Sequence, residues 1–360
     1  MEKLYSQEIK IENKEIGSNH PTYFIADIAA NHDGYLERAK DLIYLAAESG
    51  ADAAKFQHFD ASTIVSDFGF RSLGGHLSHQ AQWEKSVFEV YQDASLNPDW
   101  PPILSETCKM AGITFMTSPY SFELVDLVEP YVSSYKIGSG DITWLQLIEH
   151  IVKKKKPVLL ATGASTMDDV VRAVDAIGAC NRDIVLMQCN TNYTAKPENF
   201  SYLNLNVLKQ FALMYPGMVL GFSDHTFGHS SVLGAVALGA KVIEKHFTDD
   251  NDRQGPDHKF AMNSENWREM VNRTRELEFA LGRGIKKVEE NEKETVVLQR
   301  RSIRAKYQLK LGNIINFENT EALRPCPEYA ITPDQWDAII GKTVVNDIEA
   351  GDTIRWSDLK

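Results

Sequence analysis

The sequence predicts a (β/α)8 TIM barrel followed by a small, mostly β domain. Three observations lead to this prediction. Eight strand-like runs alternate with helix-like stretches along the chain, which is the repeat of such a barrel. Polar residues, among them two histidines, recur at the ends of those runs. After residue 284 the sequence changes to a charged stretch and then to short β-type runs.

The predicted elements follow one another in a regular order. The strand-like runs cover Tyr23–Ala29, Ala53–Gln57, Ile113–Thr117, Ser134–Ile137, Val158–Ala161, Ile184–Cys189, Met218–Phe222 and Val242–Lys245. The helix-like stretches cover Leu36–Ser49, Ile103–Ala111, Phe122–Val128, Trp144–Lys154, Met167–Ile177, Leu203–Tyr215, Ser230–Leu238 and Ser264–Leu281. A doubly wound open sheet is the alternative, and it is weakened because no G-x-G-x-x-G motif follows the first strand.

The chain divides into a barrel domain over residues 1–284, a linker over 285–300 and a second domain over 301–360. Residues 1–20 form an N-terminal extension of the barrel domain. The segment 60–102 is too long for an ordinary loop and is predicted to be an insertion. Such an insertion on the catalytic face often shapes or covers a site. The second domain has about 60 residues, near the lower limit for independent folding. We expect it to gain stability by packing against another surface.

The second domain is predicted from short β-type runs separated by turns. These runs cover Ser302–Ala305, Ile314–Phe317, Thr343–Val345 and Thr353–Arg355. One helical turn is expected over Pro333–Ile340.

Composition and charge exclude several classes of function. The formal net charge of −12 argues against nucleic acid as the main partner. It does not exclude a small anionic substrate, because a few lysines and a metal reverse the local sign. No segment approaches the roughly 20 apolar residues that span a bilayer, and the charged first residues lack the apolar core of a signal peptide. Four cysteines without C-x-x-C spacing predict reduced thiols in the cytoplasm.

Two histidines occupy equivalent positions after neighbouring strands. His225 lies in Gly221–Thr226 (GFSDHT) and His246 in Glu244–Thr248 (EKHFT). Because the carboxyl ends of consecutive parallel strands lie side by side, both imidazoles can converge at the mouth of a barrel. The alternative is that one histidine is satisfied in the core while the other lies on a loop. Their shared position after a strand favours a pair of metal ligands.

Two lysines lie within predicted barrel strands. A lysine is costly there unless it is paired or faces an anion. Lys55 shares one face of its strand with Gln57 because side chains alternate along a strand. Together with the hydroxyl groups of Ser139 and Ser223, Lys55 and Lys136 form a plausible cradle for phosphate and carboxylate groups. For each lysine alone, a structural salt bridge or a position outside the barrel is as compatible with the sequence as a ligand contact.

These motifs jointly resemble the N-acetylneuraminate (sialic acid) synthase family over nearly the whole chain. The motifs that carry the resemblance are Lys55–Gln57 (KFQ), Thr117–Tyr120 (TSPY), Lys136–Gly140 (KIGSG), Ala161–Gly163 (ATG), Gly221–Thr226 (GFSDHT), Glu244–Thr248 (EKHFT) and Gly255–His258 (GPDH). The resemblance implies a transferase that condenses phosphoenolpyruvate with an open-chain N-acyl hexosamine, giving a nine-carbon 2-keto-3-deoxy acid and phosphate. The acceptor would be N-acetylmannosamine or a 2,4-diacetamido-trideoxyhexose.

The resemblance also implies a divalent metal, Mn²⁺ first, with Mg²⁺ or Co²⁺ as alternatives. It implies a C-terminal antifreeze-like (SAF) domain, which in a homodimer crosses to the active site of the partner. The catalytic residues would be Asp27, Asp141, His225 and His246, with His225 and His246 holding the metal. The phosphoenolpyruvate site would comprise Lys55, Ser118, Lys136, Ser139, Thr162, Thr191 and Ser223. The sugar site would comprise Asp27, Gln57, Tyr193, Asp257 and Arg324, the last supplied by the SAF domain of the partner.

The chain departs from the family pattern at two positions. Asp27 and Asp141 stand where the family usually has Glu, so each carboxylate reaches about one methylene less far. One alternative function is a phosphoenolpyruvate-dependent synthase that acts on a different aldose. A phosphorylated acceptor would call for clustered arginines, for which Arg71 and Arg253 are the evident candidates. The other alternative is a non-catalytic, ligand-sensing barrel. Val90–Gln92 in the insertion resembles relatives that use 2,4-diacetamido-trideoxyhexoses.

Overall fold

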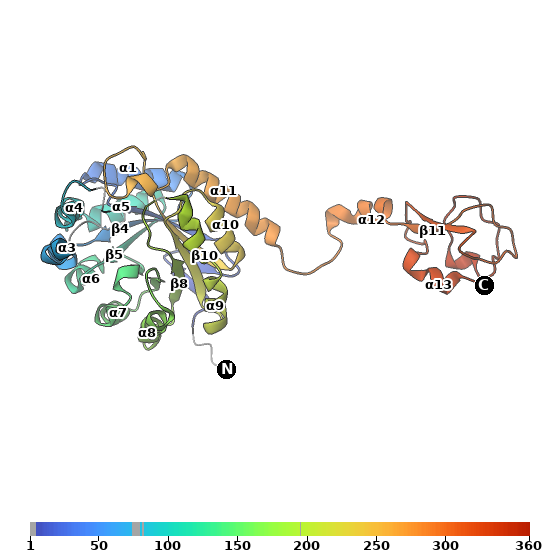
Figure 1. Ribbon diagram of the computed structural model, residues 1–360, viewed down its shortest axis with the longest axis horizontal. Helices are drawn as coiled ribbons and strands as arrows, with labels where there is room; N and C mark the ends of the chain where they lie inside the picture. The colour runs from blue at the N-terminus through green and yellow to red at the C-terminus, as the bar shows by residue number, and fades with distance from the viewer. Residues whose placement is uncertain (1–4, 74–79, 81–82, 195) are drawn as a thin grey trace. The chain divides into compact units, whose positions relative to one another are not determined.

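The computed structural model describes residues 5–73, 80, 83–194 and 196–360. Eight parallel strands form a near-closed barrel with helices outside it (Figure 1). Hydrogen-bonded neighbours follow the order β5-β4-β3-β10-β9-β8-β7-β6, and β5 also contacts β6. The barrel strands are β3 (Tyr23–Ala29), β4 (Ala53–His58), β5 (Thr114–Pro119), β6 (Tyr135–Ile137), β7 (Val158–Ala161), β8 (Ile184–Cys189), β9 (Val219–Asp224) and β10 (Ala240–His246). The predicted TIM barrel is confirmed.

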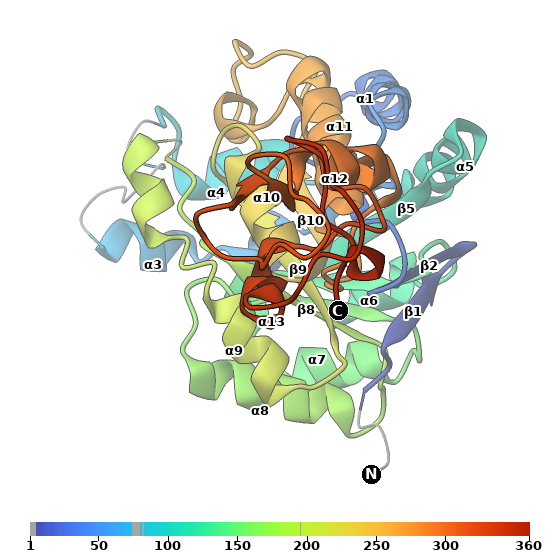
Figure 2. The same cartoon turned by 90° about the vertical axis from the view of Figure 1, so that its right-hand side faces the viewer.

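The helices between the strands surround the barrel (Figure 2). They are α1 (Leu36–Glu48), α5 (Pro101–Ala111), α6 (Phe122–Val128), α7 (Leu145–Val152), α8 (Met167–Gly178), α9 (Val207–Met214), α10 (Ser230–Ala237) and α11 (Ser264–Leu281). Local sequence explains several of their ends. Thr166 and Asp169 form a capping box at the start of α8. Gly112, with a φ of 75°, ends α5 in the left-handed conformation that glycine adopts without strain.

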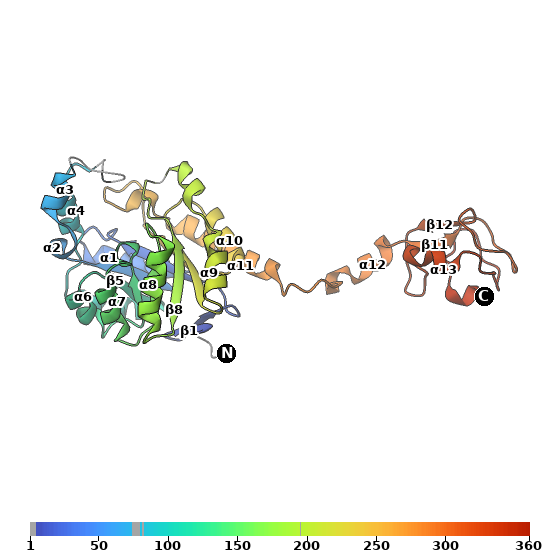
Figure 3. The same ribbon diagram turned by 60° about the horizontal axis from the view of Figure 1, so that its bottom comes forward.

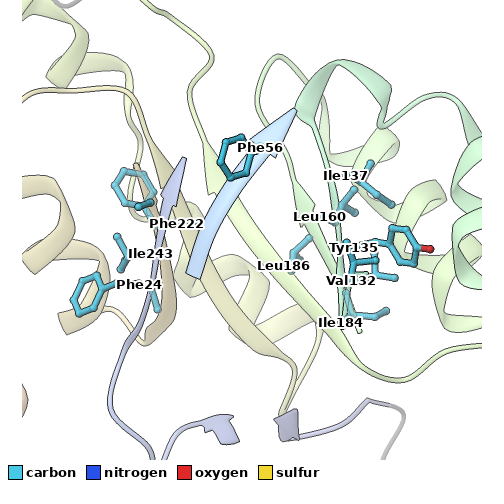
Figure 4. Close-up of a cluster of buried hydrophobic side chains, with 14 of the residues drawn as sticks. Phe24, Phe56, Val132, Tyr135, Ile137, Leu160, Ile184, Leu186, Phe222 and Ile243 are labelled. Carbon is cyan, nitrogen blue, oxygen red and sulfur yellow. The ribbon is translucent and has the colours of Figure 1, made fainter. Parts of the chain in front are cut away.

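Each barrel strand has one face toward the helices and one toward the barrel interior. The outward side chains pack under the helices in one large hydrophobic cluster. Figure 4 shows Phe24, Phe222 and Ile243 of neighbouring strands gathered in one part of this layer. The inward side chains at the amino ends of the strands form a second apolar cluster, which includes Ile25 and Val242. The period-two alternation of strands therefore divides the barrel into two cores.

The N-terminal extension covers the amino end of the barrel. Strands β1 (Glu8–Ile11) and β2 (Lys14–Gly17) pair in antiparallel fashion. Their side chains Ile9, Ile11 and Ile16 are fully buried in the inner apolar cluster. This hairpin and the helix α3 of the insertion lie at opposite ends of the barrel (Figure 3).

The insertion after β4 contains short helices at the carboxyl end of the barrel. They are α2 (Ala61–Ile64), α3 (Asp67–Ser72) and α4 (Val87–Ala94). Ser86 and Glu89 form a capping box at the start of α4. Residues 74–79 and 81–82 of the predicted insertion lie outside the described residues, as do residues 1–4 of the predicted extension.

The contacts within the chain define two units, Met1–Gly282 and Arg283–Lys360. In the second unit, β11 (Ser302–Ala305) pairs with β12 (Thr320–Leu323) in antiparallel fashion. This unit also contains α12 (Lys293–Gln299) and α13 (Trp336–Ile339). Its buried side chains form a separate hydrophobic core: Ile303, Ala305, Leu309, Ile315, Ile331, Ile339, Val344, Ile348 and Ile354.

The remaining short elements are 3-10 helices. They are η2 (Ser139–Asp141), η3 (Pro197–Tyr202), η4 (His258–Phe260), η5 (Glu290–Glu292), η6 (Pro333–Gln335) and η7 (Trp356–Asp358). None of the helices in the described part of the chain has the length and apolar character needed to cross a membrane.

Candidate active site

A pocket of about 400 Å³ opens at the carboxyl ends of the barrel strands. Most of the predicted site residues line it: Asp27, Lys55, Gln57, Ser118, Lys136, Ser139, Asp141, Tyr193, Ser223, His225, His246 and Asp257. Further side chains that the sequence analysis did not assign to the site also line it: Phe59, Trp83, Tyr91, Tyr120, Cys189 and Glu244.

Strand alternation carries these side chains into the pocket. The inward face of β10 presents Val242 to the lower apolar cluster and then Glu244 and His246 to the pocket. In the same way, β4 presents Ala53 to the apolar cluster and Lys55 to the pocket. The barrel interior therefore changes from apolar to ionic along the direction of the strands.

Glu244 lies between the two lysines at the deep end of the pocket. Its Oε1 is 3.1 Å from Lys136 Nζ and 3.5 Å from Lys55 Nζ, and it accepts a hydrogen bond of 3.1 Å from Ser223 Oγ. Burial alone would raise the pKa of Glu244, but Lys136 and Lys55 outweigh it and lower that pKa to about 2. The sequence analysis missed Glu244 as a site residue, although it shares a strand face with His246.

Asp27 contacts the other side of the lysine cluster. Its Oδ2 is 2.7 Å from Lys55 Nζ and accepts a hydrogen bond of 3.3 Å from Gln57 Nε2. His246 Nε2 lies 3.6 Å from the same oxygen. Burial raises the pKa of Asp27, and the charge of Lys55 opposes this shift. Asp27 reaches Lys55 although its side chain is one methylene shorter than that of glutamate. Its carboxylate therefore lies close to both Lys55 and His246.

The two histidines face each other in the pocket, with ring centroids 5.4 Å apart. His225 Nδ1 lies 2.8 Å from the carbonyl oxygen of Asn190. A carbonyl only accepts, so Nδ1 carries the proton and Nε2 has a free lone pair. Burial lowers the pKa of His225 to about 3 and that of His246 to about 4. Both rings are therefore neutral near pH 7, which is the form that binds a metal.

The surroundings of the histidines fit a metal with open coordination positions. His246 Nδ1 is buried without a hydrogen-bond partner among the described residues, and it lies 3.9 Å from Asp257 Oδ2. The described residues contain no group of three or more His, Cys, Asp or Glu side chains arranged to hold a metal. Two imidazoles alone would leave the other positions to water and substrate, as in catalytic rather than structural metal sites.

Aromatic rings form the outer wall of the pocket. Tyr193 stacks edge-on against His225 with a centroid distance of 4.3 Å. Among the other rings that line the pocket, Phe59 lies 5.2 Å from the ring of Tyr91 and 6.1 Å from that of Tyr120. Tyr91 belongs to α4, so the insertion supplies part of this wall. Such rings suit the apolar faces and acyl methyl groups of a sugar derivative.

Two predicted phosphoenolpyruvate contacts do not line the pocket. Thr162 is buried, and its hydroxyl donates a hydrogen bond of 2.9 Å to the carbonyl oxygen of Met187 on the next strand. Thr191 places its methyl group beside Gly163, where an added Cβ would lie only 2.5 Å from it. In the structure these two threonines contact neighbouring strand ends, and their role in binding phosphoenolpyruvate stays a prediction.

The predicted serines and Asp141 also line the pocket. Ser118 Oγ is buried without a hydrogen-bond partner among the described residues, so it is available to a ligand. Ser139 Oγ accepts a hydrogen bond of 2.9 Å from the amide of Gly163 and is fixed in the pocket. Burial raises the pKa of Asp141 to about 6, which suits proton exchange near neutral pH.

Arg324 belongs to the second unit. Its Nε donates a hydrogen bond of 2.7 Å to the carbonyl oxygen of Gln299. Arg71 and Arg253, the candidate contacts for a phosphorylated acceptor, pair with Asp67 and Asp249 and do not line the pocket.

Buried lysines, carboxylates and neutral imidazoles gather at the carboxyl end of this TIM barrel, where the active sites of TIM-barrel enzymes lie. The chain belongs to the NeuB family, whose model matches residues 42–286, and residues 300–360 match the SAF domain. The predicted family and its second domain are thereby confirmed.

Named relatives agree with this family. The chain is 33% identical to N,N'-diacetyllegionaminic acid synthase of Legionella pneumophila, over 96% of this chain and 97% of that protein. It is 31% identical to pseudaminic acid synthase of Campylobacter jejuni, over 94% and 96% of the two chains. The crystal structure of N-acetylneuraminic acid (sialic acid) synthetase from Leptospira borgpetersenii, in complex with citrate, superposes with a TM-score of 0.71 at 27% identity, over 81% and 96%. The protein is thus a sialic acid-type synthase, a transferase.

Proposed function

We propose that the protein condenses phosphoenolpyruvate with the open-chain form of an N-acyl hexosamine, releasing phosphate and a nine-carbon 2-keto-3-deoxy acid. The acceptor is N-acetylmannosamine or a 2,4-diacetamido-trideoxyhexose. The observation that carries this proposal is that two buried lysines and two neutral imidazoles line the same pocket. The relatives named as legionaminic and pseudaminic acid synthases support it.

The deep end of the pocket suits the anionic substrate. Lys55 and Lys136 would face the phosphate and carboxylate groups, with Ser118 and Ser139 donating hydrogen bonds and Ser223, which donates to Glu244, beside them. The positive charge of the lysines is already largely compensated, because Glu244 contacts both of them and Asp27 contacts Lys55. A highly charged enol phosphate therefore needs further positive charge close by.

A divalent metal at His225 and His246 would supply that charge, with Mn²⁺ preferred and Mg²⁺ or Co²⁺ as alternatives. When bound there, it would polarise the aldehyde group of the acceptor as a Lewis acid. The neutral state of both imidazoles and the unsatisfied nitrogen of His246 support this assignment.

The chain's own residues would orient the reactants and move protons. The double-bond electrons of the enol phosphate form a bond from C3 to the aldehyde carbon, whose oxygen becomes the new hydroxyl group. Water then adds at C2, and the resulting hemiketal phosphate loses phosphate to give the ketone. Asp141 is the candidate group to take the proton from that water, because its pKa is about 6. Asp27 and Gln57 would position the acceptor beside the enol phosphate.

The charge of the pocket favours an acceptor without a phosphate group. Among the described residues that line the pocket, Lys55 and Lys136 are the cationic side chains, since both histidines are neutral, and both lysines belong to the deep end. The outer wall carries apolar and aromatic side chains, including Val90 and Tyr91 of the insertion. This surface suits the methyl and acyl groups of a deoxygenated, N-acylated sugar better than a second phosphate.

Incubation of the protein with phosphoenolpyruvate, Mn²⁺ and a panel of aldoses tests the proposal. We expect phosphate release and a nine-carbon acid, identified by mass spectrometry, with an N-acyl hexosamine or a 2,4-diacetamido-trideoxyhexose. Mannose and N-acetylmannosamine 6-phosphate are the matched controls and should react much more slowly. Preference for the phosphorylated sugar would contradict the proposed acceptor class, and release of phosphate with no sugar product would contradict condensation.

We also propose a homodimer in which Arg324 of one chain contacts the N-acyl group at the site of the other. The planar guanidinium group offers several donors and suits an amide oxygen. Mixing Arg324→Ala with His225→Ala chains should recover part of the activity, because one hybrid site then holds both intact groups. Subunit exchange without recovery would show that Arg324 does not act across the dimer.

We place the protein in the cytoplasm. Phosphoenolpyruvate is an intracellular metabolite, and the four cysteines, Cys108, Cys180, Cys189 and Cys326, are free thiols as expected for a reducing compartment.

A further inference from the structure

A buried ion pair lies directly behind the two histidines. Asp224 and Lys245 each precede one of the histidines in the sequence, and they face each other in the register of β9 and β10. Because side chains alternate along a strand, the histidines point into the barrel and this pair points outward. Lys245 Nζ is 2.6 Å from Asp224 Oδ2, and the two side chains are 1% and 0% exposed. Neither residue lines the pocket.

The pair also holds the backbone that follows His225. Asp224 Oδ1 accepts hydrogen bonds from the amide and the hydroxyl of Thr226, at 2.9 and 2.8 Å. Lys245 Nζ donates a second hydrogen bond to the carbonyl oxygen of Thr226. Ser231 Oγ, at the start of α10, donates to Asp224 Oδ2 at 2.6 Å. The residue before His246 is thus bound to the residues before and after His225.

We propose that Asp224 and Lys245 are positioning residues that set the separation of the His225 and His246 imidazoles for a divalent metal. This inference rests on the proposed metal site. Stability alone is a weak reason for such a pair, because an apolar pair of similar size in a buried position is often equally stable. What an apolar pair cannot supply is the set of directed bonds that ties the two strand ends together beside the ligands. Outer contacts of this kind orient metal-binding histidines.

The test compares metal affinity with stability in the full-length protein. The double variant Asp224→Leu/Lys245→Met replaces the ion pair by an apolar pair. Its Mn²⁺ affinity, measured by electron paramagnetic resonance of free Mn²⁺ without substrates, should fall by roughly 10–100-fold. Its thermal unfolding midpoint should fall, because the buried amide and carbonyl oxygen of Thr226 lose their partners, so binding is measured at a temperature where both proteins are folded. Phosphoenolpyruvate binding in the absence of metal should remain unchanged.

Two further variants keep the test decisive. Ser231→Ala removes one hydrogen bond to Asp224 without burying an unpaired charge, and it should weaken Mn²⁺ binding about threefold to tenfold. Glu278→Gln is the matched control: Glu278 accepts hydrogen bonds from Thr22, just before β3, and pairs with Arg275. It should lower the unfolding midpoint without changing Mn²⁺ affinity.

The outcomes separate this inference from the proposed function. If the parent protein binds Mn²⁺ and His225→Ala abolishes that binding, the metal site stands. If the folded double variant then binds Mn²⁺ as tightly as the parent, the pair is only structural and the inference is wrong. If the double variant fails to fold, parental affinity in Ser231→Ala overturns the inference instead. A parent protein that binds no divalent metal at the histidines overturns the metal site and the inference together.

Discussion

The two ends of the barrel interior differ in chemistry although the same strands build both. At the amino end, inward positions such as Ile25, Leu159 and Val242 pack with the β1–β2 hairpin into a closed apolar core. At the carboxyl end, inward positions of the same strands present Asp27 and Glu244, together with lysines and imidazoles, to an open pocket. The first arrangement stabilises the barrel by burial. The second confines charges at an energetic cost that a ligand reduces.

Removing the metal should produce the largest effect at the carboxyl end. Chelation of the divalent ion should abolish phosphate release, because the lysines are largely compensated by Glu244 and Asp27. Adding Mn²⁺, Mg²⁺ or Co²⁺ should restore it. The measurement is phosphate release before and after chelation, with circular dichroism as the control for folding. Full turnover of thoroughly demetallated protein would contradict the metal requirement.

Replacing Lys55 or Lys136 should have the second-largest effect. Lys55→Met leaves Asp27 without its lysine, Lys136→Met leaves Glu244 with Lys55 alone, and each removes a contact to the enol phosphate. We expect a loss of about 3–5 kcal/mol in binding of phosphoenolpyruvate, measured by calorimetry. Lys154→Met is the matched control, since Lys154 pairs with Asp126 and Glu129 outside the pocket. Near-normal affinity in both cradle variants would show that the lysines are structural.

The pH dependence of turnover should give a smaller effect. A carboxyl group whose folded pKa is raised to about 6 is protonated below that pH, so Asp141 loses its capacity to accept a proton there. The turnover number should fall as the pH is lowered through about 6 and level off above it. Asp141→Asn should reduce turnover roughly 100-fold or more and remove this inflection. An unchanged inflection in the variant would assign it to another group.

The raised pKa of Asp141 should favour turnover at high pH but lower the stability of the fold there. Burial makes the ionised form of Asp141 unfavourable, so the folded protein pays this cost fully above pH 6 and loses it as the pH falls. Asp141→Asn should therefore be more stable than the parent above pH 6, and the two should converge at lower pH. Thermal unfolding at several pH values measures this difference.

A substitution at the amino end should change stability and leave catalysis intact. Leu159 is fully buried in the inner apolar cluster. Leu159→Ala should lower the free energy of unfolding by about 2–5 kcal/mol, with little change in the turnover number at a permissive temperature. Denaturant unfolding and phosphate release measure the two effects. A large loss of turnover in the folded variant would show that the two ends of the barrel are coupled.

Much of the barrel and its site could be predicted from the sequence. The strand and helix order predicts the fold because the two hydrophobic periods differ, and the period of two along each strand places Lys55, Glu244 and His246 on inward faces. The second unit was predicted less completely. The run Ser302–Ala305 forms β11, whereas Ile314–Phe317 contributes only a single bridge, from Ile314 to Thr343. The strand β12 was missed, since short edge strands depend on their partner more than on their own sequence.

The sequence by itself determined which side chains reach the carboxyl end of the barrel, because strand alternation is a local property of the backbone. Only the tertiary structure decided what each of them does there. Thr162 has the residue type and position of a phosphate contact, but its hydroxyl is used by the carbonyl oxygen of Met187 on a neighbouring strand. Glu244 became a site residue because Lys55 and Lys136 converge on it from two other strands. A hydrogen-bond partner or a counter-ion is a relation between distant segments, and the closure of the barrel creates it.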